Sequence, residues 1–161
     1  MITEVCVGEC MKRQVVVVKG STTVQEAGRV VVTNHVGTLP VVDDEGVLTG
    51  VVRLQDLLGV FMPDFVALLD SIDFVHDFGA LEQVEPKHMS EVAALPVGAL
   101  AGPPVAVEED SRLLHSLATI VKHQLQDLPI VDRTGRLVGI ASRVDIAAAF
   151  FAGWAKEGSL S

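Results

Sequence analysis

The sequence predicts an α+β fold in which two similar halves, related by a pseudo-twofold axis, pack together through their sheets, with a helical insertion between them. The main observation is an internal repeat, because residues 39–57 align with residues 128–146 without a gap and eight of the nineteen positions are identical. Each copy alternates short apolar segments with segments of helical periodicity. A half of about 50 residues cannot bury both faces of a three-stranded sheet, so the copies are expected to cover each other.

The composition agrees with this class and excludes several functions. Apolar residues make up 49% of the 161 residues and aromatic residues only 4%, so the core must consist of Val, Leu, Ile and Ala, which favours strands mixed with helices. The formal net charge of −9 opposes binding to nucleic acid. Apolar runs fall short of the ~20 residues that a membrane-spanning helix needs, and the N-terminus lacks the pattern of a secretory signal. We therefore expect a soluble, cytoplasmic protein without membrane contact.

Each copy is expected to begin with a strand and a helix. Apolar residues after each first strand recur at a spacing close to the 3.6-residue period of a helix. Thr22 or Thr23 can begin the first helix, with Glu26 three residues after Thr23 as in a capping box, and Ser111 can begin the second. The two first strands are expected at residues 15–18 and 105–107.

A hairpin and a further helix are expected to complete each copy. The turns place Gly46 and Gly135 where a tight hairpin needs a residue free to adopt a positive φ. The paired strands are expected at residues 39–42 with 47–52, and at residues 128–131 with 137–141.

The segment between the copies does not repeat and is expected to be helical. Pro63 suits the first turn of a helix, and the apolar residues that would share one face of it are Phe65, Leu68, Leu69 and Ile72. Such a face can cover the core or form a subunit or partner contact. The expected organisation is a first repeat with the N-terminal segment at 1–61, the inserted connection at 62–99, and a second repeat with a C-terminal helix at 100–161.

The repeated unit resembles a tandem pair of cystathionine-β-synthase (CBS) domains. The likeness rests on "LPVVD…G…GVV…D" in the first copy and "LPIVD…G…GIAS…D" in the second, and it covers residues 11–61 and 100–151. The resemblance implies a disc-shaped module, often dimeric, whose clefts bind adenosine-containing ligands such as AMP, ADP, ATP or S-adenosylmethionine. It implies a regulatory protein that requires no cofactor for chemistry.

The family's nucleotide motif is Gly, two apolar residues, Ser or Thr, two arbitrary residues and Asp. The second copy has this motif intact, with Gly139, Ser142 and Asp145. Ser142 would lie where a strand ends and a helix begins, so that backbone amides and the hydroxyl can hold a phosphate. The Asp145 carboxylate can accept hydrogen bonds from both ribose hydroxyls. The same spacing is close to that of a helix capping box, and the two roles are compatible.

Further ligand contacts follow from the family's positions. Pro104 and Val105 are the expected neighbours of the adenine, whereas Arg143 can add charge near a phosphate or can be an ordinary surface residue. The first copy departs from the motif, because it keeps Asp56 but has Arg53 in place of the hydroxyl. Arg53 can fill that pocket or offer its guanidinium to a phosphate. We therefore expect one good ligand site.

Two functions are compatible with these features. The first is a regulatory module that binds an adenosine ligand and signals by conformational change to a separate partner protein. The alternative is a structural or interaction protein with a degenerate pocket, which binds partners through its acidic surface and inserted helices.

An enzyme or a metal site is not expected. No motif places a nucleophile beside a base, and no Walker-type loop occurs in the sequence. Cys6 and Cys10 lack the second pair of ligands that a structural zinc site needs. The high apolar content favours an exposed apolar face, so a homodimer is the expected oligomeric state.

Overall fold

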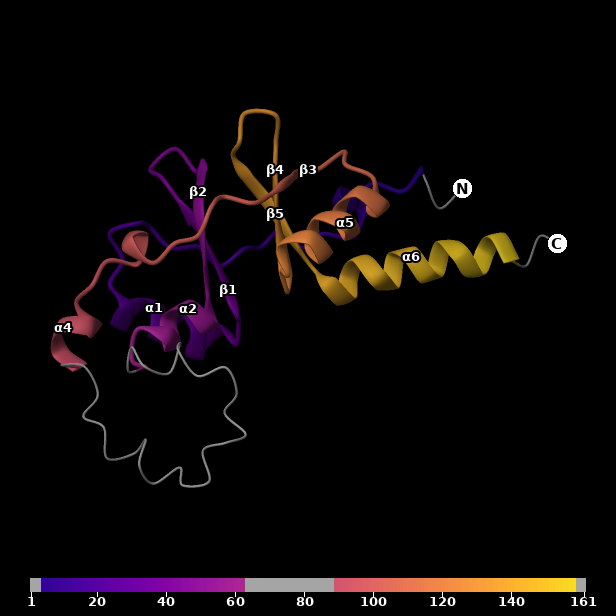
Figure 1. Ribbon diagram of the computed structural model, residues 1–161. Coiled ribbons are helices and arrows are strands. Elements are labelled where there is room, and N and C mark those ends of the chain that lie inside the picture. Colours follow the sequence, from indigo (N-terminus) through magenta and orange to yellow (C-terminus); the bar gives the residue numbers. More distant parts are fainter. Residues whose placement is uncertain (1–3, 63–88, 159–161) are drawn as a thin grey trace, which may run out of the picture.

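The protein forms two hairpins that stand side by side, with helices gathered along one side of them (Figure 1). The structure is a computed structural model, and it describes residues 4–62 and 89–158. The first half contains α1 (Val24–Asn34), β1 (Thr38–Val42), β2 (Leu48–Arg53) and α2 (Leu54–Gly59). The second half contains β3 (Val107–Glu108), α5 (Leu113–His123), β4 (Asp127–Val131), β5 (Leu137–Ser142) and α6 (Arg143–Gly158). Three short elements complete the described chain: η2 (Val7–Glu9), α4 (Met89–Ala93) and η5 (Val97–Ala99).

Both hairpins agree with the prediction. β1 pairs antiparallel with β2, and β4 pairs antiparallel with β5, with an irregularity at the same point of each ladder. Gly46 has φ = 82° and Gly135 has φ = 84°, which is the left-handed region that glycine adopts without strain. The repeated glycine is therefore explained by the geometry of the turn.

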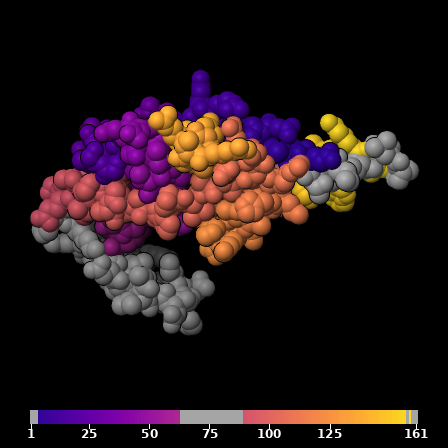
Figure 2. Space-filling view, turned by 90° about the horizontal axis from the view of Figure 1, so that it is seen from above, coloured from indigo at the N-terminus to yellow at the C-terminus, as the bar shows by residue number. Residues whose placement is uncertain are grey.

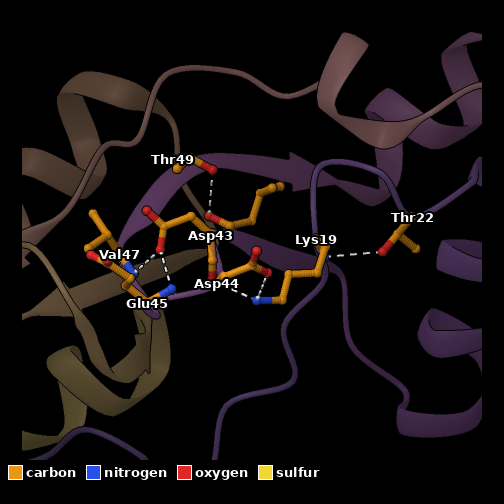
Figure 3. Close-up of polar contacts among 8 residues, drawn as sticks. Lys19, Thr22, Asp43, Asp44, Glu45, Val47 and Thr49 are labelled. Atoms are coloured by element: carbon orange, nitrogen blue, oxygen red, sulfur yellow. Dashed lines mark hydrogen bonds and ion pairs between the residues drawn. The ribbon is translucent and has the colours of Figure 1, made fainter.

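An aspartate braces each hairpin turn. Oδ1 of Asp43 accepts a hydrogen bond of 2.9 Å from the backbone N–H of Val47 (Figure 3), and Asp132 makes the equivalent bond in the second half. Nζ of Lys19 donates to the Asp43 carbonyl at 2.7 Å and lies 3.3 Å from the Asp44 carboxylate. The bonds to Asp43 and Asp132 satisfy turn amides, and Lys19 fixes the first turn to the segment before α1.

The two halves meet at the hairpin tips through a symmetric pair of hydrogen bonds. The N–H of Leu48 donates to the carbonyl of Gly135, and the N–H of Leu137 donates to the carbonyl of Gly46, both at 3.0 Å. Donors and acceptors in the two bonds are related by the 89-residue offset of the repeat. The predicted α+β fold with pseudo-twofold packing is confirmed.

The first strand of each copy is shorter than predicted. In the described chain, residues 15–18 contribute a single bridge, from Val18 to Val41, and the second copy keeps the two-residue β3, parallel to β4. Lys12 is already paired with Ile140 of the second half. The chain must therefore cross from the second half to the first between Lys12 and Val18. Within residues 15–18, only Val18 is then aligned with β1.

The two long helices of the repeats begin differently. Oγ1 of Thr23 accepts from the N–H of Glu26 at 3.2 Å, and the Glu26 carboxylate accepts from the N–H of Thr23 at 2.9 Å, so the predicted capping box of α1 is confirmed. The N-cap of α5 is Arg112, and Ser111 lies one residue too early. The carbonyl of Ser111 instead accepts from the N–H of Val7 at 2.8 Å, so a tertiary contact holds this residue in the preceding turn.

The N-terminal segment, residues 5–12, packs on the second half (Figure 2, where its indigo atoms lie against the orange half). Val7 is fully buried in the core cluster of the second half. Lys12 exchanges two backbone hydrogen bonds with Ile140, at 2.8 and 2.9 Å. The segment that the sequence joins to the first repeat thus completes the second half.

The segment before the second repeat, residues 95–102, packs on the first half. Val97 is fully buried in the core cluster of the first half, and Gly102 exchanges two backbone hydrogen bonds with Val51 of β2. Each half therefore contains a segment that precedes the other copy in sequence. This exchange determines which residues surround each motif.

The remaining predictions concern the insertion, the cysteines and the membrane. The helical face predicted after Pro63 lies outside the described residues.

Cys6 and Cys10 are free thiols. Burial and, to a smaller extent, the negative charge of Asp145 raise the pKa of Cys10. The helices in the described ranges are too short or too polar to cross a bilayer.

Candidate functional site

Ser142 and Asp145 lie at the junction where β5 ends and α6 begins. The N–H of Asp145 donates to Oγ of Ser142 at 3.0 Å, and the N–H of Ser142 donates to Oδ2 of Asp145 at 2.9 Å. This is the reciprocal pattern of a capping box. It fixes both side chains at the start of α6, and it engages one carboxylate oxygen, Oδ2.

Lys12 reaches the same junction from the N-terminal segment. Its Nζ lies 3.5 Å from Oδ2 of Asp145. Burial raises the pKa of Asp145, but hydrogen bonds from Ser142 and the charge of Lys12 outweigh it, so the pKa of Asp145 is lowered overall. The carboxylate is therefore ionised at neutral pH. Lys12 could not be predicted from the sequence motif, because only the exchange of segments brings it to this junction.

A cavity of about 310 Å³ opens beside the junction. It lies within the size range of small-molecule sites. Both halves contribute to its wall, which mixes apolar and charged side chains. Among its lining residues are Lys12, Gln14, Val15, Val16, His35, Val36, Thr38, Asp127 and Ile140.

Thr38 and Asp127 connect the two halves inside this cavity. Oγ1 of Thr38 donates to Oδ2 of Asp127 at 2.7 Å, and Thr38 is only 6% exposed. In the ladders, Thr38 is the register partner of Arg53, and Asp127 is the register partner of Ser142. The hydrogen bond therefore links the residues that stand opposite the two motif positions.

Arg53 and Asp56 form the corresponding junction of the first half. Nε and Nη2 of Arg53 donate to the two carboxylate oxygens of Asp56, each at 3.1 Å, and the N–H of Arg53 donates to Oδ2 at 2.8 Å. A fork of this kind is a geometrically specific charge-assisted pair. It uses both oxygens of Asp56. Arg53 also lines a cavity of about 290 Å³ together with Thr38 and Gln126.

Three other expected site residues, Arg143, Pro104 and Val105, are not among the residues that line the cavity of about 310 Å³. Nε and Nη2 of Arg143 donate to the carbonyl of Leu125 at 3.2 and 2.6 Å, so this guanidinium ties α6 to the segment before β4. Pro104 and Val105 follow Gly102, which is bonded to the first half, and Val105 packs against the core cluster of the second half. Because of the exchange, residues 14–16 line the cavity instead.

The motif glycine of each copy lies under an exchanged segment. A Cβ atom at Gly139 would lie 2.9 Å from Cγ of Met11 and 3.0 Å from the carbonyl oxygen of Lys12. A Cβ atom at Gly50 would lie 3.0 Å from the carbonyl oxygen of Gly102. Both copies therefore need glycine for packing, whether or not the serine follows it.

Known proteins share this sequence pattern over nearly the whole chain. The family model of the CBS domain matches residues 7–63 and 97–152. The chloroplastic CBS domain-containing protein CBSX1 of Arabidopsis thaliana is 32% identical over 152 residues, which are 89% of this chain and 63% of that protein. The chain likewise spans 57% of CBSX2 from the same organism.

Solved structures agree with the sequence comparison. The crystal structure of CBSX2 from Arabidopsis thaliana has a TM-score of 0.70 and 30% identity, and the alignment covers 93% of this chain and 96% of that one. A structure of CBSX2 in complex with AMP has a TM-score of 0.67 and 29% identity, with coverage of 91% and 96%. Two matched CBS domains, one in each half of a shared fold, show that this chain belongs to the CBS domain family.

Proposed function

We propose that this chain is a regulatory module that binds an adenosine-containing ligand in the cavity beside Ser142 and Asp145. The observation that carries the proposal is this cavity, because Lys12 and an apolar wall line one space between the halves, and Nζ of Lys12 lies 3.5 Å from the Asp145 carboxylate. Lys12 and the Ser142 hydroxyl would hold a phosphate. Oδ1 of Asp145, the oxygen outside the capping box, would accept from the ribose.

The adenine would lie against the apolar part of the wall. Val15, Val16 and Val36 line the cavity and would contact the ring faces. They take the place expected for Pro104 and Val105. Mostly apolar walls with a few convergent polar groups are typical of sites for small ligands. The related CBSX2 has been solved with AMP, which supports a ligand of this class.

A ligand in this cavity would contact both halves and could stabilise one arrangement of them over another. Lys12 and Thr38 come from one end of the chain, and Asp127 and Ile140 come from the other, yet all four line the same space. A ligand that binds one arrangement of the halves more tightly shifts the equilibrium toward it. The proposed output is a change of surface that a separate partner protein recognises, without catalysis by this chain.

A homodimer is proposed on the helical side of the molecule. Val32 of α1 is 72% exposed and Val121 of α5 is 68% exposed, and the two positions are related by the repeat offset. A face with its own approximate twofold symmetry is suited to contact with the same face of a second copy. Sedimentation of the wild-type chain should give a dimer, and Val32→Glu together with Val121→Glu should give monomers.

The alternative function, an interaction protein with a degenerate pocket, is favoured by one observation. The Arg53–Asp56 fork occupies the first junction with protein atoms. If the second junction were equally unable to accept a ligand, only the surface would remain for binding partners.

Calorimetric titration of the purified chain with AMP, ATP and S-adenosylmethionine separates the two functions. The regulatory proposal expects at least one of them to bind with one site per chain. The absence of heat from all three at millimolar concentration would favour the interaction protein. Mass spectrometry of ligand carried through purification is an independent measurement of the same point.

A further inference from the structure

The charges around the cavity carry an inference about which adenosine compound binds. Lys12 and Asp127 line the cavity, and Nζ of Lys12 lies 3.5 Å from the motif residue Asp145. We propose that Asp127 is a specificity-determining residue that limits the negative charge of the ligand, so that the cavity favours AMP over ATP. This inference rests on the proposed function, and it adds a residue that the nucleotide motif does not contain.

Asp127 faces the place where a phosphate would bind. It stands directly opposite Ser142 in the antiparallel ladder, and the side chains of such pairs lie on one face of the sheet with Cβ atoms about 4.5–5.5 Å apart. Asp127 is among the residues that line the cavity. A phosphate that contacts the Ser142 hydroxyl would therefore lie within a few ångströms of a second negative charge.

Thr38 holds that carboxylate in place. The hydrogen bond from Oγ1 of Thr38 to Oδ2 of Asp127 is 2.7 Å long, and Thr38 is 6% exposed. A buried donor that would lose its partner resists any rotation of the acceptor. Asp127 is therefore fixed beside the phosphate position and does not simply turn away from an incoming anion.

The positive charge available to offset this repulsion is already shared. Lys12 Nζ lies 3.5 Å from Asp145, and the guanidinium of Arg143 is bonded to a backbone carbonyl. His35 also lines the cavity. One phosphate can be held by Lys12 and the Ser142 hydroxyl, but each further phosphate adds charge near Asp127 without a new cation from this set. Coulomb repulsion at such separations changes affinity by on the order of tenfold per charge.

The first half has the opposite arrangement of charge. The residue equivalent to Asp127 is the uncharged Thr38, and the residue equivalent to Ser142 is the cationic Arg53. The carboxylate therefore occurs only in the second copy and is not a repeated feature of the two halves. Substituting Asp127 by the residue found at the equivalent position tests the inference within the same fold.

The experiment is calorimetric titration of full-length wild type and Asp127→Asn with adenosine, AMP and ATP. The amide keeps the shape of the carboxylate and an oxygen for Thr38, so the fold is expected to persist. Wild type should bind AMP more tightly than ATP. Asp127→Asn should raise the affinity for ATP about tenfold and leave that for adenosine within about twofold. The matched control is Asp44→Asn, which removes the same charge from the surface beside Lys19 and should change no affinity.

A second variant tests whether the effect comes from loss of the charge and not from the new amide group. Asp127→Thr should shift the ratio of ATP to AMP affinity in the same direction. Binding of AMP and ATP with equal affinity, or a ratio unchanged in both variants, would overturn this inference and leave the proposed function standing. If wild type binds none of these three compounds and no S-adenosylmethionine, the proposed function itself is overturned, and this inference with it; binding of S-adenosylmethionine alone would overturn only this inference.

Discussion

The two strand-to-helix junctions of this protein share a backbone and differ in chemistry. In both, the N–H of the residue that ends the strand donates to an aspartate three positions later, at 2.8 Å from Arg53 and at 2.9 Å from Ser142. The first aspartate is then covered by the guanidinium of the same residue, whereas the second meets a hydroxyl and a lysine from a distant segment. Within one fold, the residue that ends the strand and the segment that crosses it separate an internal ion pair from a candidate ligand site.

The Arg53–Asp56 pair matters more because it occupies the first junction than because it stabilises the fold. The Arg53 side chain is 37% exposed, and exposed ion pairs contribute about 0–1 kcal/mol. The pair therefore stabilises the fold only slightly. Its larger consequence is that both oxygens of Asp56 have partners before any ligand arrives.

Asp145→Ala and Asp56→Ala give the largest expected difference between the junctions. Asp145→Ala should weaken adenosine-ligand binding by about 1.5–3 kcal/mol, the range for hydrogen bonds to a charged group, because it removes the proposed ribose acceptor. Asp56→Ala should leave that affinity nearly unchanged. Calorimetry measures both, with thermal unfolding as the check on folding. Equal losses in the two variants would mean that the junctions do not differ as described.

Gly139→Ala tests the feature that both junctions share, which is a motif glycine packed under an exchanged segment. A methyl group there would press on Met11 and on the Lys12 carbonyl, and overpacking of this kind costs about 1–3 kcal/mol. Urea denaturation should show this loss of stability. The control is Gly28→Ala in α1, where a Cβ atom meets nothing within 4 Å and the helix should gain about 1 kcal/mol. A stable Gly139→Ala protein would contradict the close crossing of the two segments.

Arg53→Ser would convert the first junction into the motif of the second. The fork is lost, at a cost of about 1 kcal/mol or less, and Asp56 becomes available beside a hydroxyl. Calorimetry should then show a second, weaker binding event in addition to the first. Unchanged stoichiometry would show that more than the arginine distinguishes the two junctions.

The pH dependence of stability gives the smallest expected effect. The pKa of Asp145 is lowered below its ordinary value of 3.8, so its ionised form stabilises the folded state above that value, and this contribution is lost as the pH falls through the folded-state pKa. The difference in unfolding free energy between wild type and Asp145→Asn should therefore be constant above about pH 5 and shrink below pH 4. A difference that grows on acidification would show that the carboxylate is not stabilised by Ser142 and Lys12.

Local features of the fold could be predicted because they depend on neighbouring residues. The hairpins, their glycines and the capping box of α1 follow from spacing of a few residues, and short-range hydrogen bonds and φ preferences act over that distance. The first strands and the start of α5 were predicted less well. At both places a contact from the N-terminal segment overrides the local preference.

The sequence by itself determined that the chain contains two similar units and that only one of them carries the complete Ser and Asp pair. The tertiary structure alone decided that the segments before the repeats exchange places, that Lys12 meets Asp145, and that Thr38 binds Asp127. The physical reason is that a repeat specifies the conformation and the buried face of each unit. The partners of a side chain at a boundary between units depend on the path that the chain takes from one half to the other.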